Sequence, residues 1–546
     1  MTHELTPGIV SFDELGFFSR LYRQYCADFD RLAPFYNVDF RTRDGRVRSA
    51  NAAATHPRDR QKLVEALREQ NARWGEDESV SRNIDALLDS GSVAVVTGQQ
   101  VGLFTGPVYT IYKTLTVLQM ARRLAEESGR TVVPVFWLEG DDHDFDEIAS
   151  ATLLTGNEVT VLRYTGHAAP PEGNLGPVGR LPFTEQIAEV VNELDATLPP
   201  TEFKPALMDA VRAAYRPGVT ILDAFARLMR SFFKGQGLVF ISPDDRRLKE
   251  LVAPLFAREI RDTHRVSGDL DGVSERLRAE YHAQVAVRPS NLFLIDERGR
   301  HPLDADDGVF RLRGADERFS GEDLIASLNQ HPERFSANVV LRPLVQDSLL
   351  PTAIYVAGPS EIAYFAQFKP VYEWAGVPMP AIYPRASVTL VEGKVRKVLD
   401  EYGLNVGDMD DELESLFQRV VRERLGSDVD AQFDQSVARI DEAIDALKPL
   451  LKGVDPTLVK SADATRAVIQ KEFERFRHRV LKAEKRNHEQ VRVKLEKARA
   501  NLFPGGKPQE RSISVLYFLN KYGPGLLADL ERSLNPESMG HQVLFL

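Results

Sequence analysis

Short apolar runs alternate with longer amphipathic segments over the first 390 residues, and this alternation predicts strands followed by helices. Runs of this kind lie at residues 92–96, 131–138, 237–241 and 352–356, and each leads through a polar or glycine-containing loop into a segment with helical spacing. Apolar runs without polar alternation are typical of parallel strands that are buried on both faces. The order of the elements therefore predicts a doubly wound α/β core.

The first strand, loop and helix of this core can be bounded from local signals. The strand is expected at 92–96, the loop at 98–106 and the helix at 109–127. Pro107 suits the first turn of that helix, and Gly129 suits the position just after its end.

The later part of the core shows the same order with two interruptions. Helices are expected at 246–261, after the third strand, and up to residue 368, after the fourth. Residues 151–235 and 291–313 break the alternation, so we expect both stretches to be insertions.

Residues 391–502 follow a different pattern, in which apolar positions repeat in steps of four and three. Two such series run through 433–451 and 469–487, and they are heptad repeats of the kind that form coiled coils. Residues 400–445 contain 14 acidic and 4 basic residues, a net charge of −10, whereas 456–502 contain 13 basic and 6 acidic residues, a net charge of +7. Opposite charges on successive helices favour an antiparallel hairpin.

The basic half of this hairpin has a second interpretation, which is binding to nucleic acid. It follows an acidic half, and its two aromatic residues, Phe473 and Phe476, belong to the apolar seam rather than to a stacking surface. The solvated face of a coiled coil is therefore the preferred interpretation. We expect a core of residues 1–390, a coiled-coil domain of 391–502 that mediates self-association, and a segment of 503–546 that packs back on the core.

Composition and charge leave the predicted fold unchanged, but they argue against several classes of protein. The 546-residue chain has 69 basic and 80 acidic residues, and a net charge of −11 does not favour a nucleic-acid partner. Its single cysteine, Cys26, excludes an intrachain disulfide and a CxxC motif. No secretory signal and no run of about 18 apolar residues is visible. We expect a cytoplasmic protein that does not enter a membrane.

Four polar loops follow the predicted strands, at the edge of the sheet where α/β proteins bind ligands. The first contains Gly98, Gln99, Gln100, Thr105 and Gly106, and it leads into a helix start whose free N–H groups favour a phosphate or a carboxylate. Its glycines allow the backbone to approach a ligand closely. The loop matches neither a P-loop nor the dinucleotide fingerprint, and a glycine-rich structural turn is the alternative.

The second loop, residues 139–147, holds six acidic residues and a histidine. Carboxylates at this density either face water or hold a cation, so a nucleotide-bound Mg²⁺ and a substrate ammonium are both candidates. Asp142, His143 and Asp144 are the predicted catalytic residues, with His143 as a general base or as a group that stabilises charge. The alternative is a solvated loop that caps a helix near Phe145.

The third loop contains Gly358, Ser360 and Glu361, which we expect to contact a nucleotide or a sugar. The fourth, residues 242–245, is better explained as a helix cap. Arg385 either closes the site or forms a surface salt bridge. Because the loops follow different strands of one predicted sheet, their convergence on one edge predicts an active site.

Three of these loops resemble motifs of the cysteine ligase family of bacillithiol biosynthesis. The resemblance rests on residues 97–107, 137–144 and 358–364, and it covers nearly the whole chain. It implies a Rossmann-like core similar to that of class I aminoacyl-tRNA synthetases, with connecting insertions and a long C-terminal antiparallel coiled coil that supports a homodimer. The His-x-Gly-His signature of class I synthetases is absent, and residues 97–106 take its place after the first strand.

The resemblance also implies a reaction, the joining of cysteine to glucosaminyl-malate through an amide bond in the last step of bacillithiol synthesis. ATP or another adenine nucleotide would activate the carboxylate, with Mg²⁺ as a candidate companion. Two alternatives stay open. One is a ligase for another carboxylate–amine pair, and the other is a nucleotide-binding partner protein that works through its coiled coil.

Overall fold

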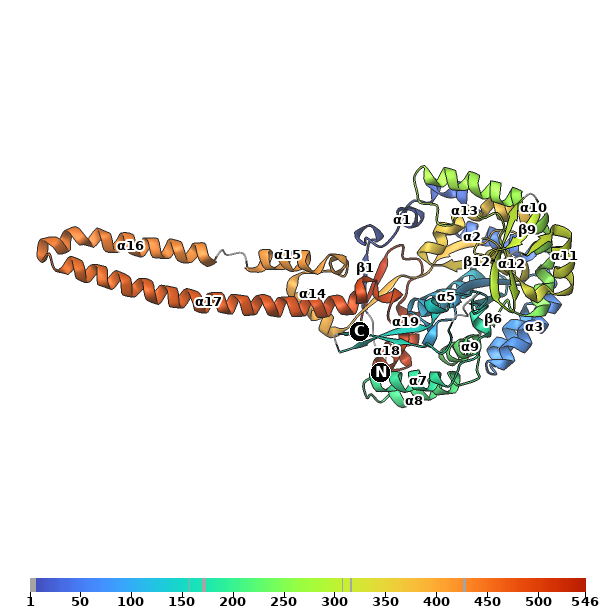
Figure 1. Ribbon diagram of the computed structural model, residues 1–546, viewed down its shortest axis with the longest axis horizontal. Helices are drawn as coiled ribbons and strands as arrows, with labels where there is room; N and C mark the ends of the chain where they lie inside the picture. Colours follow the sequence, from blue (N-terminus) through green and yellow to red (C-terminus); the bar gives the residue numbers. More distant parts are fainter. Residues whose placement is uncertain (1–5, 157, 169–172, 307, 315–316, 426–428) are drawn as a thin grey trace. The chain divides into compact units, whose positions relative to one another are not determined.

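A five-stranded parallel sheet forms the centre of the first unit of the molecule, in the order β13-β12-β2-β3-β6 (Figure 1). Its strands are β2 (Val93–Gln100), β3 (Val132–Glu139), β6 (Val239–Ile241), β12 (Thr352–Ala357) and β13 (Ala381–Pro384). The computed structural model describes residues 6–156, 158–168, 173–306, 308–314, 317–425 and 429–546.

The sheet is doubly wound. From β2 the chain proceeds outward through β3 to β6, and it then returns to the other side of β2 to add β12 and β13. The direction of winding reverses between β2 and β12, and this is the topological switch point at which such sheets bind ligands. The predicted Rossmann-like α/β core is confirmed.

β2 is longer than its apolar run predicts. Residues 98–100, expected in a loop, pair in parallel with residues 137–139 of β3. The backbone ladder continues after the strand has left the fully buried core, so Gln99 and Gln100 are half-buried while Val96 is buried. The pattern of apolar residues therefore ends before the strand does.

The helices around the sheet agree with the predicted starts and differ in length. α5 (Tyr109–Ser128) packs on β2 and β3 and ends at Gly129, whose φ of 68° is left-handed as expected for a helix stop. α13 (Pro359–Ala375) and α10 (Arg246–Arg278) both run past their predicted ends. α10 continues because its buried stripe continues, through Val266, Leu270, Val273 and Leu277.

Among the described residues, four α-helices precede the sheet in the sequence. α2 packs on β12, and α3 packs on β6. The four are α1 (Arg20–Ala27), α2 (Arg43–Thr55), α3 (Arg60–Arg73) and α4 (Glu78–Ala86).

The first insertion combines an antiparallel ribbon with helices. Strands β4 (Ser150–Thr155) and β5 (Glu158–Arg163) form the ribbon, which follows the short helix α6 (Phe145–Ile148). The helices are α7 (Gln186–Thr197), α8 (Lys204–Ala214) and α9 (Ile221–Phe232).

The second insertion is larger than the predicted stretch 291–313. It forms a five-stranded sheet in the order β10-β9-β8-β7-β11, and β11 adds to β7 from residues 335–337. Helix α11 (Gly321–Gln330) lies between β10 and β11 in the sequence, and α12 (Arg342–Leu349) lies between β11 and β12. The strands are β7 (Leu292–Asp296), β8 (Gly299–Asp306), β9 (Val309–Leu312), β10 (Arg318–Ser320) and β11 (Phe335–Ala337).

The chain forms two compact units, one of residues up to Val391 together with 504–546, and one of residues 392–503. In the first unit β15 (His541–Phe545) lies between β1 (Thr6–Val10) and β14 (Val388–Val391). The C-terminal segment also contributes α18 (Val515–Tyr522) and α19 (Gly525–Ser533).

The second unit is the predicted antiparallel coiled coil. α16 (Val429–Val454) and α17 (Leu458–Leu502) pack against each other, and Phe433 contacts Phe473 and Phe476 across the seam. Ion pairs join the acidic helix to the basic one, with Lys448 Nζ 2.7 Å from Asp463 Oδ1 and Arg477 Nη1 3.0 Å from Asp434 Oδ1.

Two shorter helices, α14 (Gly393–Tyr402) and α15 (Leu413–Leu425), also pack on α17. Across the described ranges, we find no helix with the length and apolar character needed to cross a bilayer.

Candidate active site

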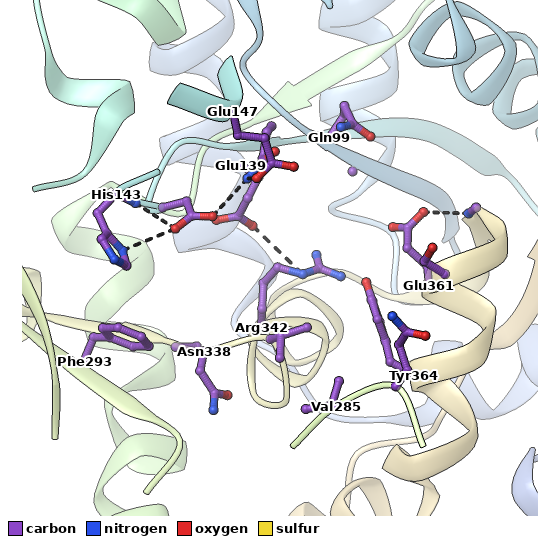
Figure 2. Close-up of a pocket in the computed structure, with 18 of the residues that line it drawn as sticks. Gln99, Glu139, His143, Glu147, Val285, Phe293, Asn338, Arg342, Glu361 and Tyr364 are labelled. Carbon is purple, nitrogen blue, oxygen red and sulfur yellow. Dashed lines mark hydrogen bonds and ion pairs between the residues drawn. The ribbon is translucent and has the colours of Figure 1, made fainter. Parts of the chain in front are cut away.

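A cavity of about 760 Å³ opens at the carboxyl ends of β2, β3 and β12, at the switch point of the sheet. Figure 2 shows His143 and Phe293 on one side of it and Glu361 on the other, with Glu139 and Arg342 between them. Residues from the second insertion complete the wall. This volume lies within the range of sites that hold cofactors and small substrates.

Most of the predicted site residues meet at this cavity. Three do not line it, namely Thr105, Gly106 and Asp144. Eight do line it, namely Gly98, Gln99, Gln100, Asp142, His143, Gly358, Ser360 and Glu361.

The first loop turns away from the cavity after β2. Phe104 and Thr105 adopt left-handed backbone conformations, with φ of 51° and 72°, and the Thr105 side chain is buried. The start of α5 is covered by the C-terminal segment, because the Val108 N–H donates a hydrogen bond of 2.8 Å to the carbonyl of Ile513. The predicted anion contact at Thr105 and Gly106 is therefore not made at this cavity.

Two of the predicted acidic positions cap helices. The Asp144 carboxylate accepts a hydrogen bond of 3.2 Å from the Glu147 N–H at the start of α6, which is the alternative role that the sequence allows. Asp245 accepts one of 2.9 Å from the Arg247 N–H and caps α10, so the capping interpretation of loop 242–245 is confirmed.

A buried ion pair lies at the switch point itself. The Lys113 Nζ lies 2.5 Å from the Glu361 Oε2, and it also donates to the Gly98 carbonyl at 2.9 Å. The same Glu361 oxygen accepts from the Gly358 N–H at 2.6 Å, and its second oxygen accepts from the Tyr355 hydroxyl at 2.7 Å. Glu361 is thus already bound within the protein, and it links the end of β2 to the start of α13.

Burial and charge shift the pKa values of both members of this pair downward. Burial lowers the pKa of the Lys113 ammonium, and Glu361 only partly opposes that effect. Burial by itself raises the pKa of the Glu361 carboxyl, but the Lys113 charge and the hydrogen bonds prevail and lower it. The carboxylate form of Glu361 is therefore favoured at neutral pH.

The acidic loop is neutralised by the protein's own groups. The Gln100 amide donates to Asp142 and to Glu147, both at 2.9 Å, and Arg300 Nη1 lies 3.6 Å from the Asp142 carboxylate. Burial alone raises the pKa of Asp142, but His143, Arg300 and Gln100 together hold it well below its usual range. Asp142 therefore carries a stable negative charge.

His143 lies between this carboxylate and the Arg300 guanidinium. Its Nδ1 is 3.3 Å from Arg300 Nη1, and a guanidinium can only donate a hydrogen bond. The same Nδ1 lies 3.4 Å from the Asp142 Oδ1, and an ionised carboxylate can only accept a hydrogen bond. Asp142 and Arg300 therefore both contact the Nδ1 side of the His143 ring.

Glu139 is a cavity residue that the motif analysis did not select, although it opens the acidic loop. Its Oε2 accepts a hydrogen bond of 3.0 Å from the Trp137 indole, and the Arg342 Nε lies 4.0 Å away. Burial raises the pKa of Glu139 because these partners offset only part of the desolvation.

Several cationic residues line the same cavity. Arg385 is buried, forms a two-pronged ion pair of 2.7 and 2.9 Å with Glu510, and lies over the Tyr109 ring at 5.3 Å. The alternative of a surface salt bridge is therefore wrong for Arg385. The remaining cavity arginines are Arg288, Arg300, Arg313, Arg342 and Arg511.

The cavity walls suit a nucleotide phosphate better than a metal held by protein ligands alone. Within the parts of the chain that the structure describes, no group of three or more His, Cys, Asp or Glu residues is arranged to hold a metal ion. The start of α13 and Arg385 instead meet at this wall, where N–H groups and a guanidinium are good partners for phosphate oxygens.

Comparison with known proteins agrees with both units of the fold. A family model described as "Bacillithiol biosynthesis BshC, N-terminal Rossmann-like domain" matches residues 9–386, and one for the "C-terminal coiled-coil domain" of the same proteins matches 388–546. A protein of Salinibacter ruber named "Putative cysteine ligase BshC" is 53% identical over 532 residues, which are 97% of each chain. A protein of the same name from Chlorobaculum tepidum is 36% identical over 95% of each chain.

Proposed function

The chain belongs to the BshC family of bacillithiol biosynthesis, and from that premise we propose that it is a ligase that forms an amide bond from the carboxylate of cysteine. The amine is that of glucosaminyl-malate, and an adenine nucleotide activates the carboxylate. The reaction takes place in the cytoplasm, where thiols are kept reduced.

The observation that carries this proposal is the division of charge within one cavity. Carboxylates at Glu139, Asp142 and Glu147 offer sites for an ammonium group, and arginines such as Arg342 and Arg385 offer sites for carboxylate and phosphate oxygens. An amide ligase must hold a carboxylate, an amine and a phosphate-bearing nucleotide together. A cavity lined only by carboxylates, or only by cationic side chains, would not suit these three groups.

The proposed roles follow from position. A nucleotide that binds here would supply a phosphoryl or nucleotidyl group that makes the carboxylate oxygen a good leaving group. The start of α13, with Ser360, and Arg385 would contact its phosphates. The Lys113–Glu361 pair fixes α13 against the end of β2, and Asp142 would orient an ammonium.

The test is direct synthesis with the full-length protein. Purified protein is incubated with cysteine, glucosaminyl-malate, ATP and Mg²⁺, and mass spectrometry follows the amide product together with AMP and ADP. We expect product only when all the substrates are present. Complete absence of product, with ATP and the other nucleoside triphosphates, would overturn the proposal.

A substrate panel separates this reaction from ligation of another pair. Serine replaces cysteine in one arm, and glucosamine replaces glucosaminyl-malate in a second. We expect cysteine and glucosaminyl-malate to give the highest kcat/KM. A higher value with a different acid or amine would identify another ligase.

A further inference from the structure

The carboxylates that line the cavity differ in how many cations and hydrogen-bond donors already contact them. This difference suits them to different chemical roles. Four of the described lining residues carry carboxylates, namely Glu139, Asp142, Glu147 and Glu361. Glu361 is bound to Lys113 at 2.5 Å and accepts two further hydrogen bonds. Asp142 accepts from Gln100, accepts from the His143 N–H at 2.7 Å and lies near Arg300.

Glu147 is the solvent-facing member of the set. It is exposed, and its carboxylate accepts a hydrogen bond of 2.9 Å from Gln100. Water screens the charge of such an exposed group. It is therefore a poor candidate for moving a proton within the cavity.

Glu139 has no close cation, and its side chain is half-buried. The structure places one indole N–H on its carboxylate, and its nearest cation lies 4.0 Å away, at the outer limit of an ion pair. In Figure 2 its side chain lies between the His143 side and the Glu361 side, toward the middle of the cavity.

We propose that Glu139 is the general base of the ligation, which removes a proton from the substrate ammonium so that the free amine can attack the activated carboxylate. This inference rests on the proposed function. It assigns to Glu139 the role of general base, for which His143 was a candidate from the sequence. His143 is already in contact with Arg300 and Asp142, at 3.3 and 3.4 Å from its Nδ1.

The step balances as follows. The Glu139 carboxylate takes one proton from the ammonium, and the nitrogen lone pair then forms a bond to the carbonyl carbon of the activated cysteine. The bond from that carbon to the oxygen of the phosphoryl or nucleotidyl group breaks, and the leaving group departs with the electron pair. The nitrogen loses its second proton to water, and Glu139 releases its proton to solvent.

The charged groups around Glu139 agree with this role. Arg342 on α12 and Arg300 on β8 favour its carboxylate, whereas Asp141, in the same loop, disfavours it. Asp141 is itself paired with Lys249 at 2.6 Å, so its influence is reduced. Burial is the largest influence and raises the pKa of Glu139, which improves a carboxylate as a proton acceptor.

The experiment compares two nucleophiles in wild-type protein and in Glu139→Gln. Glucosaminyl-malate enters as an ammonium that must lose a proton, whereas hydroxylamine is uncharged at neutral pH and attacks without that step. For Glu139→Gln we expect kcat with the amino sugar to fall by about 10²-fold or more. Hydroxamate formation from cysteine, ATP and hydroxylamine should fall by less than about tenfold, because the base contributes little to attack by a neutral amine.

The outcomes separate the two proposals. Equal losses with both nucleophiles, or no loss with either, would overturn the role of Glu139. Failure of the wild-type protein to form either product would overturn the proposed function instead. Glu189→Gln, an exposed change on α7, is the matched control and should leave both rates unchanged.

A second variant keeps the test valid if Glu139→Gln does not fold. Trp137→Phe removes the indole N–H that stabilises the Glu139 carboxylate. The acidic limb of the pH profile of kcat with glucosaminyl-malate should move to higher pH, while the profile with hydroxylamine should not move. An unmoved limb with glucosaminyl-malate would count against Glu139 as the base.

Discussion

The Lys113 ammonium lies 2.5 Å from the Glu361 carboxylate, and both side chains are largely removed from solvent where the strand order reverses. Lys113 belongs to α5 and Glu361 to α13, so the pair joins the helices that follow β2 and β12. Breaking one side of a buried pair leaves an uncompensated charge, which is costly.

Lys113→Met should therefore destabilise the first unit by about 3 kcal/mol. The measurement is the free energy of unfolding in guanidinium chloride, followed by tryptophan fluorescence. All three tryptophans of the chain, Trp74, Trp137 and Trp374, lie in this unit. The double variant Lys113→Met/Glu361→Gln removes both charges and should recover part of the loss. Equal stability of the single variant and the wild type would contradict the buried pair.

The Arg385–Glu510 contact predicts a second effect, on binding rather than on folding alone. Glu510 comes from the C-terminal segment, and it fixes the guanidinium that lines the cavity. Glu510→Gln keeps an acceptor for the Val388 N–H but loses the two-pronged ion pair. We expect KM for ATP to rise about tenfold or more, with a smaller change in kcat.

Steady-state kinetics with ATP and cysteine varied separately check this positioning role. A purely structural role would lower kcat and reduce the amount of folded protein without favouring one substrate. Arg385→Lys retains the charge and should reproduce the rise in KM, because lysine cannot make a two-pronged contact. An unchanged KM in both variants would exclude phosphate binding by Arg385.

The sequence predicted the core of this molecule well because the determining signals are local. The run 92–96, Pro107 and Gly129 mark a strand, a helix start and a helix end within about 40 residues, and the structure agrees apart from the length of the strand. The opposite charges of the two coiled-coil halves similarly predicted the pairing seen between Asp434 of the acidic half and Arg477 of the basic half.

The site was predicted only where its residues follow core strands. Gln99, Gln100, Asp142 and Glu361 all lie at or just after strand ends and could be found from that rule. The cavity arginines include residues of the second insertion and of the C-terminal segment, whose place in space depends on tertiary packing. No spacing in the sequence relates Arg300 or Glu510 to β2.

The three misplaced residues have a common cause. Thr105, Gly106 and Asp144 lie within motifs that reach the cavity, but the chain turns away at those positions. The left-handed conformation of Phe104 and Thr105 is a tertiary effect, since neither residue favours it locally.

Substitution of the Asp142–His143 pair should remove activity without unfolding the protein. Asp142→Asn abolishes a charge that would orient an ammonium, and His143→Ala removes the imidazole that contacts Asp142 and Arg300. Both side chains are about one-third exposed, at 33% and 38%, so little packing is lost. We expect product formation to fall by about 10²-fold or more in each variant.

Thermal unfolding of the same preparations checks that the fold is intact. Asp144→Asn is the matched control, because Asp144 caps α6 and does not line the cavity. Full turnover by Asp142→Asn and His143→Ala would remove this pair from the active site.

Glu259 predicts a pH dependence of stability outside the cavity. It is fully buried on α10, one oxygen accepts from the Asn291 backbone and side chain at 3.0 and 2.9 Å, and the other has no hydrogen-bond partner in the described structure. Burial raises the pKa of this carboxyl to about 7, above its ordinary value of 4.5. The folded state therefore binds the proton more tightly than the unfolded state does.

The sign follows from that difference. Below pH 4.5 both states are protonated, and as the pH rises through 7 the folded state must bury a charge, so stability falls. Glu259→Gln removes this cost, and its unfolding temperature should exceed that of the wild type above pH 7 by more than it does at pH 5. If the unfolding temperatures of Glu259→Gln and the wild type differ by the same amount at every pH, that result would contradict the raised pKa of Glu259.

The coiled coil carries apolar side chains that its own hairpin does not cover, and we propose that a second copy of the chain covers them. Val454 and Leu450 of α16 are 72% and 66% exposed, and Val468 of α17 is 62% exposed. Apolar groups that remain exposed on paired helices favour further helix packing. We therefore expect a homodimer at micromolar concentration, measured by sedimentation equilibrium.

The variant Leu450→Glu/Val468→Glu places charges on this surface and should weaken the dimer by at least about tenfold, because burying an unpaired carboxylate is costly. Val161→Glu is the matched control, since Val161 is 50% exposed on β5 of the first unit, and it should leave the dimer unchanged. A monomeric mass for the wild type throughout the micromolar range would exclude self-association through the coiled coil. Dimerisation that survives in Leu450→Glu/Val468→Glu would place the interface elsewhere.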